Sequence, residues 1–324
     1  MCEFYFVKNS NTDPCFNLAL EEYLLKYKKD YFISVWRNTP SVIVGVNQNT
    51  VSEVNLAYTE QNGIKVVRRI TGGGAVYHDL NNVNYTFIAP SKENQIPFKI
   101  WSKPVIEYLK TLGINAEFSG RNDLLIENKK ISGTAETVYK DRVLHHGTLL
   151  FDTDSNKLAF SLKENQLKTI DKGIKSVKSR VANIKDYLKS KISINEFIKG
   201  LSLYLQDKYS EYVLTDQDLI EINKLALNKY SSHEWNVGRA PKASNNFTKK
   251  FKFGIFNFNF DIINGKIENA KITGDFFPIK SILVLEEGLN GIKFSREDLK
   301  KAFLNVGEFI LNAEGEEIVN SILK

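Results

Sequence analysis

Short apolar runs alternate with helical patterns along the first half of the chain. Residues 17–26 place leucines among acidic positions, which predicts a helix that begins after Asp13 and Pro14. A second amphipathic pattern predicts a helix over residues 99–112, ended by Gly113. Runs of β-branched and aromatic residues bounded by Gly, Pro and Asn predict strands at residues 31–37, 41–46, 65–70, 75–77, 123–126, 130–133 and 144–152.

The connections between these strands indicate the type of sheet. Glu127, Asn128 and Lys129 form a tight turn between two predicted strands, which favours a mixed or antiparallel sheet over a doubly wound one. Further helical patterns at residues 194–208 and 216–230 would complete this domain. The predicted fold class is therefore α+β, with a mixed sheet in a large first domain.

A smaller α+β domain is predicted at the end of the chain. Residues 235–246 contain Gly, Pro and paired Asn residues and read as a loop-rich link. Beyond them, residues 249–261 alternate Phe with other residues, a strong strand pattern, and Asn264-Gly265 makes a hairpin turn into a second strand. The predicted division and C-terminal elements are a domain over residues 1–246, a domain over 247–324, a strand at 266–273 and helices at 295–311 and 314–323.

Composition narrows the class of protein. With 42% hydrophobic and 25% charged residues, the chain has ordinary globular usage rather than that of a disordered or collagen-like protein. The net charge of +6 favours an acidic partner or a phosphorylated substrate, and since the lysines are spread along the chain we expect no nucleic acid. Cys2 and Cys15 lie in no metal or redox spacing. Without a visible secretory signal or an apolar run of membrane length, a cytoplasmic protein with no membrane contact is expected.

The most unusual segment is residues 65–84, KVVRRITGGGAVYHDLNNVN. Three consecutive glycines between apolar strands indicate unusual backbone dihedrals or a ligand that comes close to the backbone, and successive N–H groups can hold an anion. Arg68 and Arg69 precede the glycines and would point to opposite faces of a strand, so at most one reaches the same ligand. No GK[ST] follows, so this is not a Walker A loop. A phosphate site is the sharper interpretation; a glycine-rich hairpin with solvated arginines is the alternative.

Three other clusters could carry chemistry or could be ordinary parts of the structure. Lys129 and Lys130 follow a tight turn, where lysines are commonly solvated. His145 and His146 lie in one apolar strand and face opposite ways, so they cannot hold one metal together. The sequence contains no G-x-S-x-G motif, which disfavours a Ser-His-Asp hydrolase. The basic residues within 168–184 would form either a lid that closes on an anion or a solvated surface.

Taken together, these clusters resemble the bacterial A-type lipoate–protein ligases. The resemblance rests on four motifs in order: RRITGGGAVYHDL (68–80), GRNDLLIENKKISGTA (120–135), RVLHHGTLLFD (142–152) and KGIKSVKSRVANI (172–184). It implies a mixed-sheet catalytic domain of the biotin/lipoate ligase type with a small α+β C-terminal accessory domain. One departure is Asn81, where the family commonly has glycine; Asn tolerates left-handed dihedrals, so the turn can survive.

The family's reaction has two steps. Lipoate attacks the α-phosphate of ATP to give lipoyl-AMP and pyrophosphate, with Mg²⁺ neutralising the leaving group. A lysine of an acceptor protein then attacks the mixed anhydride and forms the lipoyl amide. The implied acceptors are acidic lipoyl domains, such as those of 2-oxoacid dehydrogenase E2 subunits, and the glycine cleavage H protein. Which acceptor is used, and whether octanoate is also accepted, stays open.

The resemblance also implies residue roles. Lys130 would be the catalytic lysine that contacts the lipoate carboxylate and the adenylate, while Lys129 faces solvent. Asp123 is a candidate metal ligand, with the other metal ligands unknown. His78 and His146 would shape the site. The implied ATP- and lipoate-binding residues are Arg69, Gly72, Gly73, Gly74, Ala75, Val76, Tyr77, Asn122, Asp123, Lys130 and His146, and the implied lid residues are Lys172, Gly173, Lys178 and Arg180.

The apolar chain of lipoate needs a dry slot, for which Val42, Val44 and Val46 on one strand face are candidates. Two alternative functions remain. An octanoyl or lipoyl transferase of the same fold would form a thioester on a cysteine, for which Cys2 and Cys15 are the only candidates, and Cys15 lies outside every motif. A non-catalytic relative that only binds lipoyl domains would be expected to lack Lys130, Arg69 or the glycine run.

Overall fold

The computed structural model describes residues 3–91, 98–120, 122–163, 180–207, 209–238 and 244–323. Among these, eight strands form a mixed sheet in the order β11-β1-β2-β6-β10-β9-β8-β7. β1 runs parallel to β11 and β2, and the other pairs are antiparallel, so the predicted mixed sheet is confirmed. The strands are β1 (Phe4–Lys8), β2 (Tyr31–Trp36), β6 (Asn82–Pro90), β7 (Glu117–Ser119), β8 (Asp123–Ile126), β9 (Lys129–Tyr139), β10 (Arg142–Leu150) and β11 (Ser210–Tyr212).

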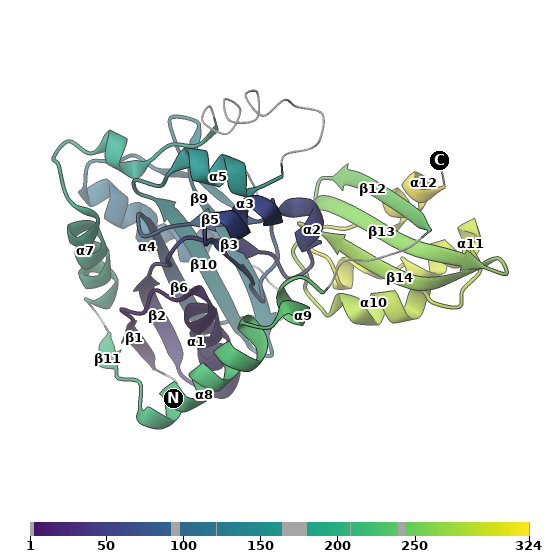
Figure 1. Ribbon diagram of the computed structural model, residues 1–324, viewed down its shortest axis with the longest axis horizontal. Coiled ribbons are helices and arrows are strands. Elements are labelled where there is room, and N and C mark those ends of the chain that lie inside the picture. The colour runs from purple at the N-terminus through teal and green to yellow at the C-terminus, as the bar shows by residue number, and fades with distance from the viewer. Residues whose placement is uncertain are drawn as a thin grey trace.

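Helices cover both faces of this sheet (Figure 1). In β2, Ile33 and Val35 join the core formed with α4 (Phe98–Thr111) and α7 (Ile194–Gln206). Phe32 and Trp36 point the other way, into the core formed with α1, α8 and the π-helix η2. Asp13 caps α1 as predicted, since its carboxylate accepts a hydrogen bond from the Cys15 amide at 2.7 Å. The helices on this second face are α1 (Pro14–Tyr27), α8 (Asp216–Leu225) and η2 (Ala226–Tyr230).

A second sheet carries the glycine run. Its central strand, β3, pairs parallel with β4 and antiparallel with β5, so the loop between β4 and β5 contains the three glycines. Val42 and Val44 pack on the side of this sheet where α3 and α5 lie. The elements are β3 (Ser41–Val44), β4 (Lys65–Arg68), β5 (Val76–His78), α2 (Thr50–Glu53), α3 (Leu56–Gln61) and α5 (Ser155–Ser161). The 3₁₀ turn η1 (Ile184–Tyr187) instead packs through Ile184 on the core of the large sheet.

The C-terminal domain is an antiparallel sheet with helices on one face. Residues 249–261, predicted as one strand, form parts of two strands. The alternation of Phe residues changes phase between Phe253 and Phe256, and the chain turns there. Residues 295–311 likewise form a helix and a separate 3₁₀ turn. The elements are β12 (Asn245–Phe251), β13 (Gly254–Ile263), β14 (Lys266–Gly274), α10 (Ile282–Leu289), α11 (Arg296–Ala302), η3 (Val306–Glu308) and α12 (Gly315–Ile322).

Buried Arg68 anchors the segment that leads to the C-terminal domain. Its side chain is 1% exposed, and its Nε donates to the Trp235 carbonyl at 2.8 Å while Trp235 Nε1 donates back to the Arg68 carbonyl. Nη1 donates to the carbonyls of Gly45 and Gln48. Arg68 thus joins β4 to α9 (His233–Asn236), which lies with α2 at the junction of the two domains (Figure 1). No helix in the described part of the chain is long and apolar enough to cross a membrane.

We expect Arg68→Ala to lower the free energy of unfolding by at least about 3 kcal/mol, because several buried carbonyls would lose a charged donor. Urea denaturation followed by circular dichroism measures this change. Arg296→Ala on exposed α11 is the matched control and should change stability by less than about 0.5 kcal/mol. Equal stability of the two variants would contradict the anchoring role of Arg68.

Candidate active site

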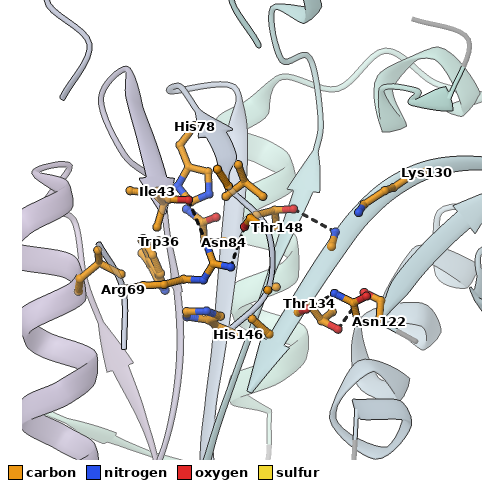
Figure 2. Close-up of a pocket in the computed structure, with 18 residues that line it drawn as sticks. Trp36, Ile43, Arg69, His78, Asn84, Asn122, Lys130, Thr134, His146 and Thr148 are labelled. Carbon is orange, nitrogen blue, oxygen red and sulfur yellow. Dashed lines mark hydrogen bonds between the residues drawn. The ribbon is translucent and has the colours of Figure 1, made fainter. Parts of the chain in front are cut away.

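A cavity of about 600 Å³, including its open mouth, lies where the two sheets of the first domain meet. One row of residues crosses four strands beneath it. Trp36 on β2 pairs with Asn84 on β6, and Asn84 pairs with Thr148 on β10. The Gly133 amide on β9 donates to Thr148 Oγ1 at 3.2 Å. Figure 2 shows the Asn84 and Thr148 side chains between Trp36 and the Lys130 side of the cavity.

The glycine loop is held by the buried guanidinium of Arg69, which is 4% exposed. Nη2 donates to the carbonyls of Gly72 at 2.6 Å and Gly74 at 2.8 Å, and Nη1 donates to the Ile43 carbonyl at 3.0 Å. Gly73 has φ of 85°, and a Cβ there would come within 3.1 Å of Arg69 Nη2. Burial lowers the pKa of Arg69 to about 10, so the group stays charged at neutral pH.

A chain of polar contacts connects this loop to the large sheet. Arg69 Nε donates to Thr71 Oγ1 at 2.9 Å, and the Thr71 hydroxyl lies 2.9 Å from His146 Nε2. His146 Nδ1 lies 3.0 Å from both carboxylate oxygens of Glu21 on α1. The Thr86 hydroxyl also donates to Glu21, at 2.6 Å. These contacts fix the His146 ring at the floor of the cavity.

The hairpin of β8 and β9 brings Lys130 to the cavity. Glu127 and Asn128 both have left-handed φ, which makes the predicted tight turn. The register of the two strands shifts at Ile131. This bulge puts Lys130 and Gly133 on one face although they are three residues apart, and a Cβ at Gly133 would lie 3.2 Å from Lys130 Nζ. Lys130 Nζ forms an ion pair with Asp123 at 2.7 Å.

The structure places eight of the sequence-predicted binding residues around one cavity, while Gly72, Tyr77 and Asp123 are not among the residues that line it. Gly72 packs against the Phe276 carbonyl, and Tyr77 points to the α3 side of its sheet because side chains alternate along β5; neither lines the cavity. Lys129 is exposed. The predicted residues that line the cavity are Arg69, Gly73, Gly74, Ala75, Val76, Asn122, Lys130 and His146.

The predicted lid falls mostly outside the described residues. Lys172, Gly173 and Lys178 belong to that part, while Arg180 is exposed. Shortly after those residues, the Ala182 amide donates a hydrogen bond to the Lys130 carbonyl at 2.9 Å. The chain therefore returns to the sheet beside the candidate catalytic lysine.

The predicted valine face does not form the apolar end of the cavity, since none of Val42, Val44 and Val46 is among the lining residues. Val42 and Val44 pack with Tyr77 away from the cavity, and Ile43 between them faces it. Trp36, Asn84 and Thr148, the residues of the row beneath the cavity, were not predicted from the sequence. A signal existed in β6, where Asn82, Asn84 and Thr86 alternate with three apolar residues. The apolar lining of this end comes from Leu18, Trp36 and Ile43.

His145 faces away from the cavity, as predicted from strand alternation. Its Nδ1 lies 2.6 Å from Glu136 Oε1, and both side chains are fully buried. Burial raises the pKa of Glu136 to about 9 and holds the pKa of His145 well below its usual range. Both groups are therefore neutral at pH 7, on the opposite side of the strands that carry Lys130 and His146.

Family models, curated proteins and solved structures similar to this chain are known. Residues 13–206 match the model of the lipoyl protein ligase A/B catalytic domain, and residues 240–322 match that of the bacterial lipoate protein ligase C-terminus. Lipoate–protein ligase 1 of Staphylococcus aureus is 43% identical over 92% of each chain. The structure of LipL1 from P. falciparum in complex with lipoate is 30% identical over 98% of each chain, with a TM-score of 0.80. A lipoate-protein ligase A bound with ATP is 30% identical over 73% of this chain and 98% of its own, with a TM-score of 0.62.

We expect the free energy of unfolding of Glu136→Gln, relative to that of the natural protein, to increase as pH rises from about 4.5 to 9. The Glu136 pKa is raised on folding, so the stability that the neutral carboxyl contributes is complete below the unfolded pKa and is lost as pH rises through the folded pKa. The amide does not titrate. Denaturation at pH 5, 7 and 8.5 measures the difference, with exposed Glu287→Gln as control. A difference independent of pH would contradict a neutral Glu136.

Proposed function

We propose that this chain, which belongs to the lipoate–protein ligase family, activates free lipoate with ATP and joins the lipoyl group to a lysine of an acceptor protein. It is a ligase that acts through an acyl adenylate. The observation that carries the proposal is a single cavity with an apolar end, a glycine loop and a lysine at its side. These three parts suit the acyl chain, the phosphate and the charge of the reacting group.

In the first step, a carboxylate oxygen of lipoate attacks the α-phosphorus of ATP, and the bond to pyrophosphate breaks. Negative charge grows on the α-phosphoryl oxygens, which needs fixed cations and close backbone. Lys130 supplies a cation at the cavity, and its ion pair with Asp123 orients it. The open glycine loop lets a phosphate approach the backbone, since a Cβ at Gly74 would meet no atom within 4 Å.

The lipoyl chain would lie in the apolar end formed by Leu18, Trp36 and Ile43. Burying its four methylenes contributes about 3 kcal/mol. This burial holds the carboxyl group near the glycine loop, and an acceptor lysine would enter from the open mouth. The amine then attacks the acyl carbon, the carbon–oxygen bond to AMP breaks, and the amine proton leaves to solvent.

ATP reaches such enzymes with Mg²⁺, which shields the leaving pyrophosphate. In the described ranges no group of three His, Cys, Asp or Glu side chains could hold a metal ion, and Asp123 already pairs with Lys130. The residues that the structure describes do not build a metal site of their own. We therefore assign Mg²⁺ to the triphosphate and make no step of the reaction depend on Asp123 as a ligand.

We propose acidic lipoyl domains, including those of the glycine cleavage H protein and of 2-oxoacid dehydrogenase E2 subunits, as acceptors. The net charge of +6 favours encounter with an acidic partner. Because the reaction consumes ATP, we place it in the cytoplasm.

A thioester-forming transferase would use Cys2, which lies outside the described residues, or Cys15, whose surroundings do not suit that role. Cys15 is 8% exposed, donates through Sγ to the Tyr230 carbonyl, and is absent from the lining of the cavity. Burial raises the pKa of the Cys15 thiol, which disfavours the thiolate that such a mechanism needs.

The proposed function is tested by mass spectrometry of an H protein incubated with this chain, lipoate, ATP and Mg²⁺. We expect a lipoyl mass increase that disappears when lipoate or ATP is omitted. A mass increase without ATP would favour a transferase. Binding of the H protein with neither a mass increase nor pyrophosphate release would favour a non-catalytic relative.

We expect Lys130→Ala to lower lipoate-dependent pyrophosphate release at least about 100-fold, because the cavity loses the cation nearest the growing charge. Lys129→Ala is the matched control: this neighbouring lysine is exposed, and its loss should change the rate by less than about twofold. Circular dichroism would establish that both variants are folded. Similar rates for Lys130→Ala and the natural protein would refute the assignment.

A further inference from the structure

Two residues that line the cavity each have one buried polar atom without a hydrogen-bond partner in the described part of the chain. His78 is 4% exposed and Asn84 is 1% exposed, and both line the cavity. Within the described ranges, His78 Nε2 and Asn84 Nδ2 have no hydrogen-bond partner. A buried polar atom left unpaired is destabilising, because it loses its hydrogen bond to water and gains none in return. Two such groups that face one cavity indicate a ligand atom that pairs with them.

The hydrogen-bond network determines which His78 nitrogen carries the proton. Asn17 Nδ2 lies 3.0 and 3.2 Å from the carbonyl oxygens of Asn11 and Arg37, which can only accept, so this end of the Asn17 amide is the nitrogen. Asn17 Nδ2 therefore donates to Asn38 Oδ1, at 2.8 Å. The other end of the Asn38 amide donates to His78 Nδ1, at 3.1 Å. Since Nδ1 accepts, the proton is on Nε2, and His78 offers a donor to the cavity.

Asn84 offers a second donor. Its Oδ1 accepts from Asn82 Nδ2 at 3.0 Å, which leaves Nδ2 for the cavity. Burial lowers the pKa of His78 to about 3, so its ring is neutral at physiological pH. Both donors are therefore uncharged, in contrast to Lys130, and uncharged donors suit an oxygen that is neutral in the ground state.

The two donors lie on the apolar side of the cavity. Asn84 pairs with Trp36, and the His78 and Trp36 rings are 6.3 Å apart. Gly133, which lies against Lys130 Nζ, is two strands from Asn84, a separation of about 10 Å at the usual strand spacing. Figure 2 shows His78 and Asn84 on one side of Thr148 and Lys130 on the other. An acyl chain in the apolar end would bring its carbonyl to His78 and Asn84 and its phosphate towards Lys130.

We propose that His78 Nε2 and Asn84 Nδ2 donate hydrogen bonds to the acyl carbonyl oxygen and stabilise the oxyanion that forms during transfer. The inference rests on the proposed function. The acceptor amine forms a bond to the acyl carbon, and the carbonyl π electrons move to the oxygen between these donors. When they return, the bond to the phosphate oxygen breaks, AMP leaves with its electron pair, and the amine proton passes to solvent.

Matched variants distinguish the effect of losing a hydrogen-bond donor from the effect of changing the side-chain packing. His78→Asn keeps an acceptor for Asn38 near the Nδ1 position but removes the donor, whereas His78→Gln places an amide nitrogen near the Nε2 position. Asn84→Asp keeps the oxygen that accepts from Asn82 and replaces the nitrogen that faces the cavity. His233→Asn on α9, where His233 is exposed, controls for the loss of a histidine.

The measurement is the single-turnover rate of transfer from preformed lipoyl-AMP to H protein, with lipoyl-AMP affinity measured separately. His78→Asn and Asn84→Asp should each lower the transfer rate by about 10²–10³-fold with less than a tenfold change in affinity. His78→Gln should recover at least tenfold of that loss, and His233→Asn should match the natural protein. Unchanged transfer by His78→Asn, or equal losses in affinity and rate, would overturn the oxyanion role. No transfer by the natural protein would instead refute the proposed function.

Discussion

The buried guanidinium of Arg69 is the constraint on which the rest of the cavity depends. Three glycines in a row give a loop that has many accessible conformations, and its carbonyl groups would otherwise be free to turn. Arg69 binds the carbonyls of Gly72 and Gly74 at once and ties them to Ile43 on β3. It also reaches His146 through Thr71. A charge in the protein interior is thus used to order a flexible loop and to connect it with the large sheet.

The two adjacent arginines, Arg68 at the end of β4 and Arg69 just after it, bind different parts of the structure. Arg68 binds the segment before the C-terminal domain, and Arg69 binds the loop at the cavity. The C-terminal domain also contacts the outer side of this loop. Phe277 packs on Phe98 with ring centroids 4.8 Å apart, and its ring lies 3.3 Å from where a Cβ at Gly73 would be. The position of the loop is therefore set from both domains.

Much of the fold could be predicted because the local signals are strong. The Asp13-Pro14 start of α1, the bounds of β8 and the Asn264-Gly265 turn all follow from residue type and position. Strand β6 was missed since Asn82 and Asn84 resemble turn residues, although they are the polar face of a central strand. Their role depends on a cavity formed by distant segments, and such tertiary context is not visible in local propensity.

Sequence motifs pointed to Arg69 and Lys130, which the structure places at one cavity, whereas the placement of other lining residues depends on packing. Which face of β3 meets the cavity depends on how two sheets are set against each other, so Val42 and Val44 proved to face away and Ile43 inward. The β9 bulge that turns Lys130 inward has no local signature in the sequence. The proton position on His78 needed the full chain of contacts from Asn17.

The central claim is that one cavity holds the acyl chain against the large sheet and the phosphate beside the β8–β9 hairpin. A crystal structure of this chain with a non-hydrolysable lipoyl-AMP analogue tests it most directly. The account predicts the acyl chain between Trp36 and Ile43, the group in place of the carbonyl beside His78 and Asn84, and the phosphate or its substitute within hydrogen-bond distance of Lys130. An analogue bound in the reverse direction, or outside this cavity, would contradict the account.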